Sequence, residues 1–141
     1  MAGDATSSTS RRRVLIVEDN PLNMKLFSAM IEAQGYDVLQ AIDGQGGIEV
    51  AQRQHPDLII MDVQLPGDIS GLDVTVSLKA DGQTRDIPII ATTAFAQQFE
   101  EERIRASGCD GYMAKPIAIS EFLDLIDSLI ARPSEAPRRI A

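Results

Sequence analysis

Three carboxylates, a hydroxyl and an ammonium group follow the apolar segments of this chain. Glu18 and Asp19 come directly after VLIV, and Asp62 comes directly after DLIIM. Thr93 follows IPIIA after one further threonine, and Lys115 follows GYMA. If these apolar segments are parallel strands, their carboxyl ends meet at one edge of a sheet. The sequence therefore predicts that all five groups lie in a single cleft.

Such a cleft favours divalent-metal and phosphoryl chemistry. Three carboxylates close together repel, so each holds its proton more tightly unless a cation compensates them. Hard oxygen ligands favour Mg²⁺ or Mn²⁺, and the chain's single histidine and single cysteine do not suggest zinc. Mg²⁺ keeps several waters and takes phosphate oxygens as partners. An aspartate that attacks phosphorus would form an aspartyl phosphate, with Lys115 as the second positive charge and Thr93 as a hydrogen-bond donor.

Five short segments have the composition of strands. VLIV (14–17), DLIIM (57–61) and IPIIA (87–91) are apolar on both faces, which is typical of central strands in a parallel sheet. YDVLQA (36–41) and GYMA (111–114) carry a weaker strand signal.

The intervening segments have helical spacing. Asn20 is a good N-cap with Pro21 at the first helical position, and Gly35 ends that helix. The other helices are expected from Asp43 through Ala51 and over about 72–78, 97–106 and 120–131. Five βα units in succession predict an α/β fold, a parallel sheet with helices on both faces.

The order and spacing of four motifs, VLIVEDNPLN, DLIIMDVQLP, IIATTA and GYMAKP, resemble the receiver domain of two-component response regulators. The resemblance covers residues 13–131. It implies a five-stranded (βα)5 flavodoxin-like fold with strand order 2-1-3-4-5. Residues 1–12 are then expected to be a disordered N-terminal arm, and residues 132–141 a flexible C-terminal tail.

The resemblance also implies how the acidic residues are used. Asp62 is the phosphoacceptor and a ligand of Mg²⁺, for which Mn²⁺ can substitute. Asp19 binds the ion directly, and Glu18 binds it through a water molecule. The backbone carbonyl of Gln64 is the remaining protein ligand.

Further roles fall on the last two strands. Lys115 is expected to bridge to the phosphoryl group, with a cis peptide bond to Pro116. Thr93 is the switch hydroxyl and Tyr112 the switch aromatic residue. Since side chains alternate along a strand, Thr92 is expected to be a core residue instead.

The loop after the phosphoacceptor departs from the family pattern. The segment DVQLPGDISG (62–71) is one residue longer than usual, and the extra residue is Gly67 or Asp68. Gln64 and Phe95 flank the site at positions expected to influence hydrolysis of the phosphoryl group.

The implied function is a signalling switch and not an enzyme, apart from its own phosphorylation and autodephosphorylation. A histidine kinase or histidine phosphotransferase donates the phosphoryl group. The output is phosphorylation-dependent binding to partner proteins, including histidine kinases in cell-division control. Partner proteins are expected to bind the surface formed by the fourth helix, the fifth strand and the fifth helix. The oligomeric state is a monomer or a phosphorylation-dependent dimer. A phosphorelay shuttle between histidine phosphotransfer partners remains an alternative.

Three other functions fit the sequence less well. A haloacid-dehalogenase-like phosphatase needs a second aspartate two residues after the nucleophile, where Gln64 stands. A flavodoxin-like cofactor carrier is poorly supported by a chain with no Trp, two Tyr and no phosphate-binding Ser/Thr loop after the first strand. A binding module that has lost its chemistry is disfavoured because every expected site residue is present.

Composition narrows the class of protein further. The 141 residues include 13 Lys+Arg and 21 Asp+Glu, a net charge of −8, which argues against nucleic-acid binding. No apolar run reaches the length of a membrane span, and VLIV is too short for a signal-peptide core. These features and the single cysteine indicate a cytoplasmic protein. Only ten residues follow residue 131, so no output domain is expected. Arg11–Arg13 are expected to be solvated at the entry to the first strand.

Overall fold

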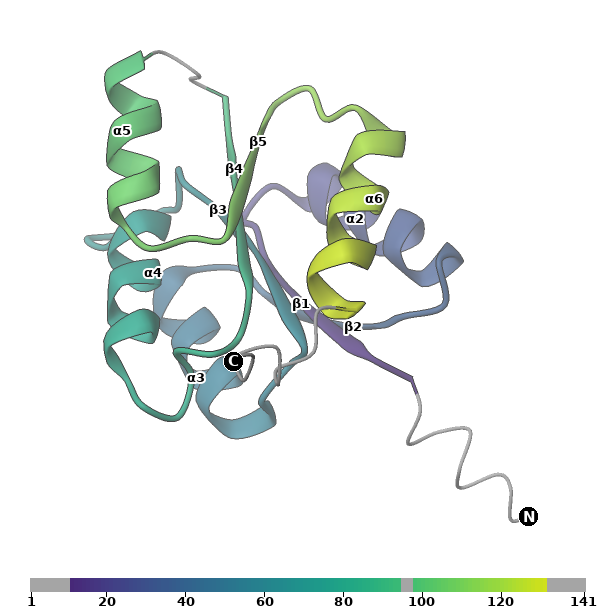
Figure 1. Ribbon diagram of the computed structural model, residues 1–141, viewed down its shortest axis with the longest axis horizontal. Coiled ribbons are helices and arrows are strands. Elements are labelled where there is room, and N and C mark those ends of the chain that lie inside the picture. Colours follow the sequence, from purple (N-terminus) through teal and green to yellow (C-terminus); the bar gives the residue numbers. More distant parts are fainter. Residues whose placement is uncertain (1–10, 95–97, 132–141) are drawn as a thin grey trace, which may run out of the picture.

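The computed structural model describes residues 11–94 and 98–131, and the side chains of all of these except residues 98 and 99. Its five strands form one parallel sheet in the order β2-β1-β3-β4-β5, with helices on both faces (Figure 1). The predicted fold class and strand order are confirmed. In chain order the elements are β1 (Arg13–Val17), α2 (Pro21–Ala33), β2 (Asp37–Ala41), α3 (Gly44–Gln54), β3 (Leu58–Asp62), α4 (Gly71–Ala80), β4 (Ile89–Thr93), α5 (Gln98–Ala106), β5 (Gly111–Ala114) and α6 (Ile119–Ala131).

The sheet separates two apolar layers. On one face α2 and α6 pack against the sheet, and on the other α3, α4 and α5 do so (Figure 1). Phe27 and Phe122 meet in the first layer with ring centroids 5.5 Å apart. The three central strands are buried on both faces, as their unbroken apolar sequences predict.

Local signals set most element boundaries. The Asn20 side chain accepts a hydrogen bond from the Asn23 N–H, which confirms Asn20 as an N-cap. Ser70 caps α4 in a reciprocal capping box with Asp73, a signal that the sequence reading missed. β4 begins two residues later than predicted, at Ile89, because Pro88 has no N–H to donate to a ladder.

The arginines before β1 pair with acidic residues of the neighbouring strand entries. Arg11 Nε lies 2.7 Å from Asp37, and an Arg12 nitrogen lies 3.5 Å from Asp57. The backbone N–H of Arg13 also donates to Asp57, at 2.8 Å. Their expected place at the entry to the first strand is confirmed. The rest of the predicted arm and the predicted tail lie outside the described residues. Among the residues that the structure describes, no helix is long and apolar enough to cross a membrane.

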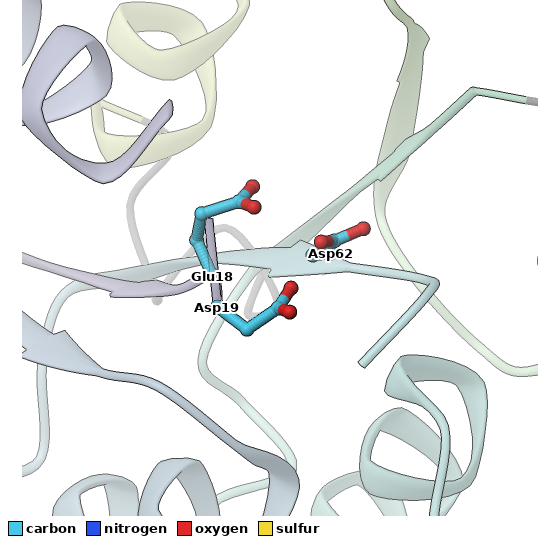
Figure 2. A group of neighbouring side chains, drawn as sticks. All are labelled: Glu18, Asp19 and Asp62. Carbon is cyan, nitrogen blue, oxygen red and sulfur yellow. The ribbon is translucent and has the colours of Figure 1, made fainter. Parts of the chain in front are cut away.

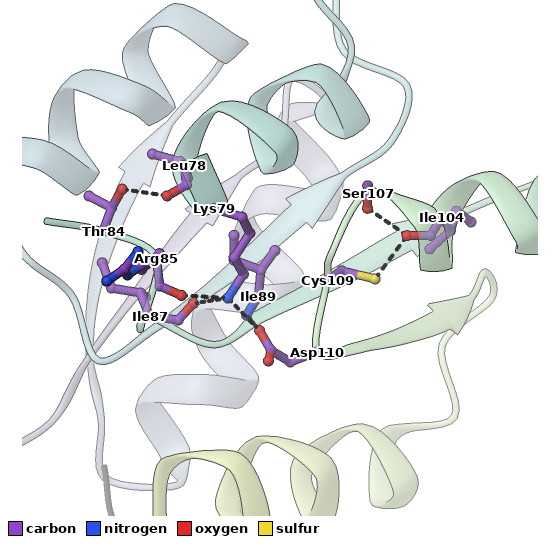
Figure 3. Close-up of polar contacts among 10 residues, drawn as sticks. All are labelled: Leu78, Lys79, Thr84, Arg85, Ile87, Ile89, Ile104, Ser107, Cys109 and Asp110. Atoms are coloured by element: carbon purple, nitrogen blue, oxygen red, sulfur yellow. Dashed lines mark hydrogen bonds and ion pairs between the residues drawn. The ribbon is translucent and has the colours of Figure 1, made fainter. Parts of the chain in front are cut away.

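A lysine connects α4 to the segments before β4 and β5 (Figure 3). Lys79 Nζ donates to the carbonyl oxygens of Arg85 (3.1 Å) and Ile87 (2.8 Å) and to the carboxylate of Asp110 (2.8 Å). The same Asp110 oxygen accepts a hydrogen bond from the Ile89 N–H at 2.9 Å. This network fixes the start of β4, and so the position of the threonines at its end.

Replacing Lys79 with methionine is expected to lower the free energy of unfolding by about 1–3 kcal/mol. Methionine keeps the apolar stem but leaves Asp110 and two carbonyl oxygens without their shared donor. Urea unfolding monitored by circular dichroism measures the effect. Lys25→Met, at an exposed position of α2, is the control. Equal unfolding midpoints for the two variants would show that the network contributes nothing to stability.

Candidate functional site

Three carboxylates converge where β1 and β3 end. The two strands run parallel and in register up to Val17 and Met61, so Glu18 and Asp19 emerge next to Asp62. One oxygen from each carboxylate lies within 4.8 Å of the others (Figure 2). Glu18 and Asp62 are 1% and 3% exposed, while Asp19 is open to solvent. The predicted meeting of these residues at the sheet edge is confirmed.

Backbone donors hold the two buried carboxylates. The Asn20 N–H donates to a Glu18 oxygen at 3.2 Å, and the Gln64 N–H donates to Asp62 Oδ1 at 3.0 Å. Both donors belong to the turns that directly follow β1 and β3. The two carboxylates are therefore oriented by the same short segments that carry the chain out of the sheet.

Lys115 lies between the two buried carboxylates. Its Nζ is 3.4 Å from Glu18 Oε1 and 3.4 Å from Asp62 Oδ1. The Lys115 N–H donates to the Thr93 carbonyl at 2.7 Å, and the bond to Pro116 is cis, as expected. One ammonium group is thus shared by two acidic side chains.

The balance of charge leaves the site acidic. Burial, together with the nearby Glu18 carboxylate, raises the pKa of Asp62 from 3.8 to about 6, although Lys115 and the Gln64 N–H oppose the shift. A positive charge placed among the three carboxylates would offset the cost of ionising the buried Asp62 beside Glu18. Their donor set, three hard oxygens of which one is exposed, fits a cation such as Mg²⁺ or Mn²⁺.

The two candidate switch residues lie in different places. Thr93 ends β4 at this sheet edge and is fully buried. Tyr112 lies in β5, and its hydroxyl donates a hydrogen bond to the Glu101 carboxylate of α5, outside the cluster of three carboxylates at the sheet edge. Phe95, expected to influence hydrolysis, is outside the described residues.

Comparison with known proteins assigns the family. A model of the response regulator receiver domain matches residues 14–127. The chain belongs to the response regulator receiver domain family. Its curated relatives include the polar-differentiation response regulator DivK of Brucella ovis, 50% identical over 119 residues, which are 84% of this chain and 96% of the relative. DivK of Brucella anthropi matches to the same extent.

Solved receiver structures agree with this receiver domain in fold. The receiver domain of a sensor histidine kinase from Pseudomonas aeruginosa PAO1 is 36% identical with a TM-score of 0.79, covering 86% of this chain and 98% of its own. That structure has a magnesium ion coordinated in the active-site cleft. A putative response regulator from Chloroflexus aurantiacus is 26% identical with a TM-score of 0.83, covering 87% of this chain and 100% of its own.

In this receiver domain, the loop after Asp62 brings the start of α4 close to the end of β3. Gly71 begins α4 so close to the Asp62 backbone that a Cβ at this position would lie 2.0 Å from the Asp62 carbonyl oxygen. Gly67 takes a left-handed φ of 93° with open space around it, and Asp68 is exposed. The residues singled out as the insertion thus lie on the outside of the loop. The requirement for glycine at 71 was missed, because it comes from a tertiary contact.

Thr92 is buried beside the site, as expected of a core residue. It pairs in register with Asp62 and is 0% exposed. Among the described residues, its hydroxyl is the one buried polar side-chain group without a hydrogen-bond partner. A buried hydroxyl without a partner loses hydration and gains nothing in return.

Thr92→Val is therefore expected to raise the free energy of unfolding by about 1–2 kcal/mol, because valine has the same shape without the unpaired hydroxyl. Chemical denaturation of the metal-free protein measures it. The matched control is Thr75→Val, since the equally buried Thr75 hydroxyl donates to the Gly71 carbonyl at 2.8 Å. Destabilisation by both substitutions would contradict the assignment of an unsatisfied group at residue 92.

Proposed function

We propose that this receiver domain accepts a phosphoryl group on Asp62 from the phosphohistidine of a histidine kinase or histidine phosphotransferase, in a reaction that requires Mg²⁺, for which Mn²⁺ can substitute. The observation that carries the proposal is the position of Asp62. Its carboxylate is 3% exposed, lies within 4.8 Å of the Glu18 and Asp19 carboxylates, and is contacted by Lys115.

Asp19, Asp62 and the Gln64 carbonyl would hold the metal ion directly, and Glu18 would act on it through a water molecule. When bound, Mg²⁺ supplies positive charge to the phosphoryl oxygens. The exposed Asp19 faces the solvent side of the cluster, and Glu18 is oriented by the Asn20 N–H. Removing either carboxylate would leave the remaining acidic groups to hold the ion with less charge.

The chemical step uses side chains already in contact. An Asp62 oxygen attacks phosphorus, the P–N bond to the donor histidine breaks, and the imidazole nitrogen leaves with the bonding electrons and takes up a proton. Lys115 moves from its shared position between two carboxylates to pair with a phosphoryl oxygen. The Thr93 hydroxyl donates to a second phosphoryl oxygen. Attack by water on the same phosphorus breaks the bond between phosphorus and the Asp62 oxygen, releases inorganic phosphate and restores the free Asp62 carboxylate.

The output is a change in partner binding. Phosphorylation favours a second conformation through Thr93 and Tyr112, and partners bind the face formed by α5, β5 and α6. The family supports histidine kinases as partners, and the Brucella relatives, which are named polar-differentiation response regulators, are consistent with the proposed role in cell-cycle or cell-division control. The single cysteine and acidic composition support a cytoplasmic location. The receiver is a monomer or forms a phosphorylation-dependent dimer.

A phosphorelay shuttle is the alternative, because it uses the same site. The two differ in the fate of the phosphoryl group. A shuttle passes it from Asp62 to a histidine of a second protein, whereas an effector keeps it until hydrolysis.

The test of the proposed output is the affinity of purified histidine kinases from the same organism for the receiver. Binding is measured with and without beryllofluoride and Mg²⁺, a combination that mimics a phosphorylated aspartate. At least one kinase is expected to bind the loaded form more tightly, with no such gain for Asp62→Asn. Equal affinity of every kinase for the two forms would contradict a phosphorylation-dependent switch.

A further inference from the structure

A glycine at the start of α3 lets the segment after Asp62 pack closely against this helix. Gly44 is buried and is the first residue of α3. A Cβ at this position would lie 2.8 Å from both Cγ1 and Cδ1 of Ile69 and 2.9 Å from Cγ2 of Val74. Carbon atoms do not approach each other this closely. The space for a side chain at residue 44 is therefore already filled, and we call Gly44, Ile69 and Val74 the glycine seat.

The glycine seat lies next to the place where the chain returns to Asp62. Its two side chains, those of Ile69 and Val74, come from either side of Gly71 in the sequence. Gly71 touches the Asp62 backbone so closely that no Cβ fits there. The Gly71 N–H also donates to the Val63 carbonyl at 3.0 Å. The glycine seat therefore holds both flanks of the segment that closes against the end of β3.

The loop between Asp62 and the glycine seat carries groups of the candidate site. The Gln64 N–H donates to Asp62 Oδ1 at 3.0 Å, and the Gln64 carbonyl is a proposed metal ligand. Farther along the loop, Gly67 has open space around it, so the additional length of the loop lies on the outside. The loop is thus anchored by β3 before Gln64 and by Ile69 after it. Without the second anchor, only β3 would fix the position of the Gln64 carbonyl.

Side-chain movement alone does not make room for a larger residue in the glycine seat. Val74 is 0% exposed, and Ile69 is packed against the same apolar layer. Both are β-branched, so few rotamers are open to them. The helix α3 is itself close to the sheet, because a Cβ at Gly47 would lie 2.9 Å from Val17 of β1. A methyl group added to Gly44 must therefore displace the backbone of the loop and the start of α4.

We propose that Gly44 is a positioning residue for the metal and phosphoryl site, because the absence of a side chain there lets Ile69 hold the loop that carries Gln64 against Asp62. The inference rests on the proposed function and adds to it a residue of α3 that lies outside the carboxylate cluster. Gly44 contacts neither the ion nor the phosphoryl group and acts through Ile69 and Val74. Metal affinity is sensitive to the groups that orient the ligands, so a change in the glycine seat should be measurable at the site.

The test is Gly44→Ala in the full chain, titrated calorimetrically with Mg²⁺ alone and then with beryllofluoride in the presence of Mg²⁺. Mg²⁺ affinity is expected to fall roughly tenfold, and beryllofluoride affinity should fall with it. In the metal-free protein, NMR should show faster amide hydrogen exchange at Gln64, because its hydrogen bond to Asp62 is weakened. Gly111→Ala is the control. A Cβ there would lie 3.2 Å from Leu125, at the amino end of β5, so this variant should keep the wild-type Mg²⁺ affinity.

A second substitution separates positioning from a general loss of stability. Ile69→Ala removes the side chain that contacts Gly44, so alone it should also lower Mg²⁺ affinity. Combined with Gly44→Ala, it makes room for the added methyl group. The double variant should then bind Mg²⁺ more tightly than Gly44→Ala alone. Val76→Ala, at an exposed position of α4, is the matched control and should bind as the wild type does. If Gly44→Ala does not fold, the comparison of Ile69→Ala with Val76→Ala carries the test.

Wild-type Mg²⁺ affinity and wild-type exchange at Gln64 in folded Gly44→Ala would overturn the positioning role and leave the proposed function intact. Losses of affinity that simply multiply in the double variant would also overturn it. If the wild-type protein itself bound neither Mg²⁺ nor beryllofluoride, the proposed function would fail, and this inference with it. The same titrations therefore distinguish the two failures.

Discussion

In the absence of Mg²⁺, Asp62→Asn is expected to stabilise the protein at pH 7 by roughly 1–3 kcal/mol. The native state holds the Asp62 carboxylate at 3% exposure beside Glu18, and its pKa rises from 3.8 to about 6. Ionising this group at neutral pH therefore costs free energy that the unfolded chain does not incur. Asparagine has the same shape and carries no charge, so it removes both the desolvation penalty and the repulsion from Glu18.

The direction of the Asp62 pKa shift determines the pH range in which Asp62→Asn is more stable than the wild type. Because the folded state binds the Asp62 proton more tightly than the unfolded chain does, the contribution of this group is fully present below pH 3.8. It is lost as pH rises through about 6. The stability difference between the variant and the wild type should be smallest near pH 4 and largest above pH 6.

Urea unfolding with a chelator across this pH range measures the difference. Asp68→Asn, in the exposed part of the following loop, is the control and should track the wild type at every pH. If the Asp62→Asn and wild-type curves ran parallel between pH 4 and 8, Asp62 would not be a destabilised buried carboxylate.

Mg²⁺ is expected to stabilise the wild-type protein strongly and Asp19→Asn much less. A ligand that binds only the folded state at 100 times its dissociation constant adds about 2.7 kcal/mol to the free energy of unfolding. Asp19 is the exposed member of the carboxylate cluster, and it is proposed to bind Mg²⁺ directly. Replacing it with an amide removes one full charge from the donor set, so Mg²⁺ affinity should fall roughly tenfold or more.

Thermal unfolding at increasing Mg²⁺ concentration gives the comparison, with isothermal calorimetry as an independent measure of affinity. Asp68→Asn again serves as the control, because it removes a negative charge close to the same sheet edge. An identical Mg²⁺ dependence for Asp19→Asn and the wild type would show that the ion does not bind where the carboxylates converge.

Sequence alone predicted the convergence of the acidic residues because it follows from topology. Once VLIV and DLIIM are neighbouring parallel strands, the residues after them must meet at one edge. The cis bond before Pro116 and the N-cap at Asn20 were also predictable, the first from the family resemblance and the second from local chemistry. The boundaries of the helices and strands were predicted less accurately, as the start of β4 at Ile89 shows.

Features that depend on packing between distant segments were not predictable. The contact of Gly71 with the Asp62 backbone arises only when α4 is placed on the sheet. The same holds for the unpaired hydroxyl of Thr92. The sequence marked Tyr112 through family resemblance, but its hydrogen bond to Glu101 depends on how α5 lies beside β5.

The most direct test of the central proposal is the intact mass of the protein after incubation with acetyl phosphate. With Mg²⁺, the wild type is expected to gain one phosphoryl group. No gain is expected with a chelator, or in Asp62→Asn under either condition. If hydrolysis outpaces detection, beryllofluoride should still bind the wild type in the presence of Mg²⁺. A phosphoryl adduct of equal size and level on Asp62→Asn, or a wild type that neither gains the adduct nor binds beryllofluoride, would contradict Asp62 as the phosphoacceptor.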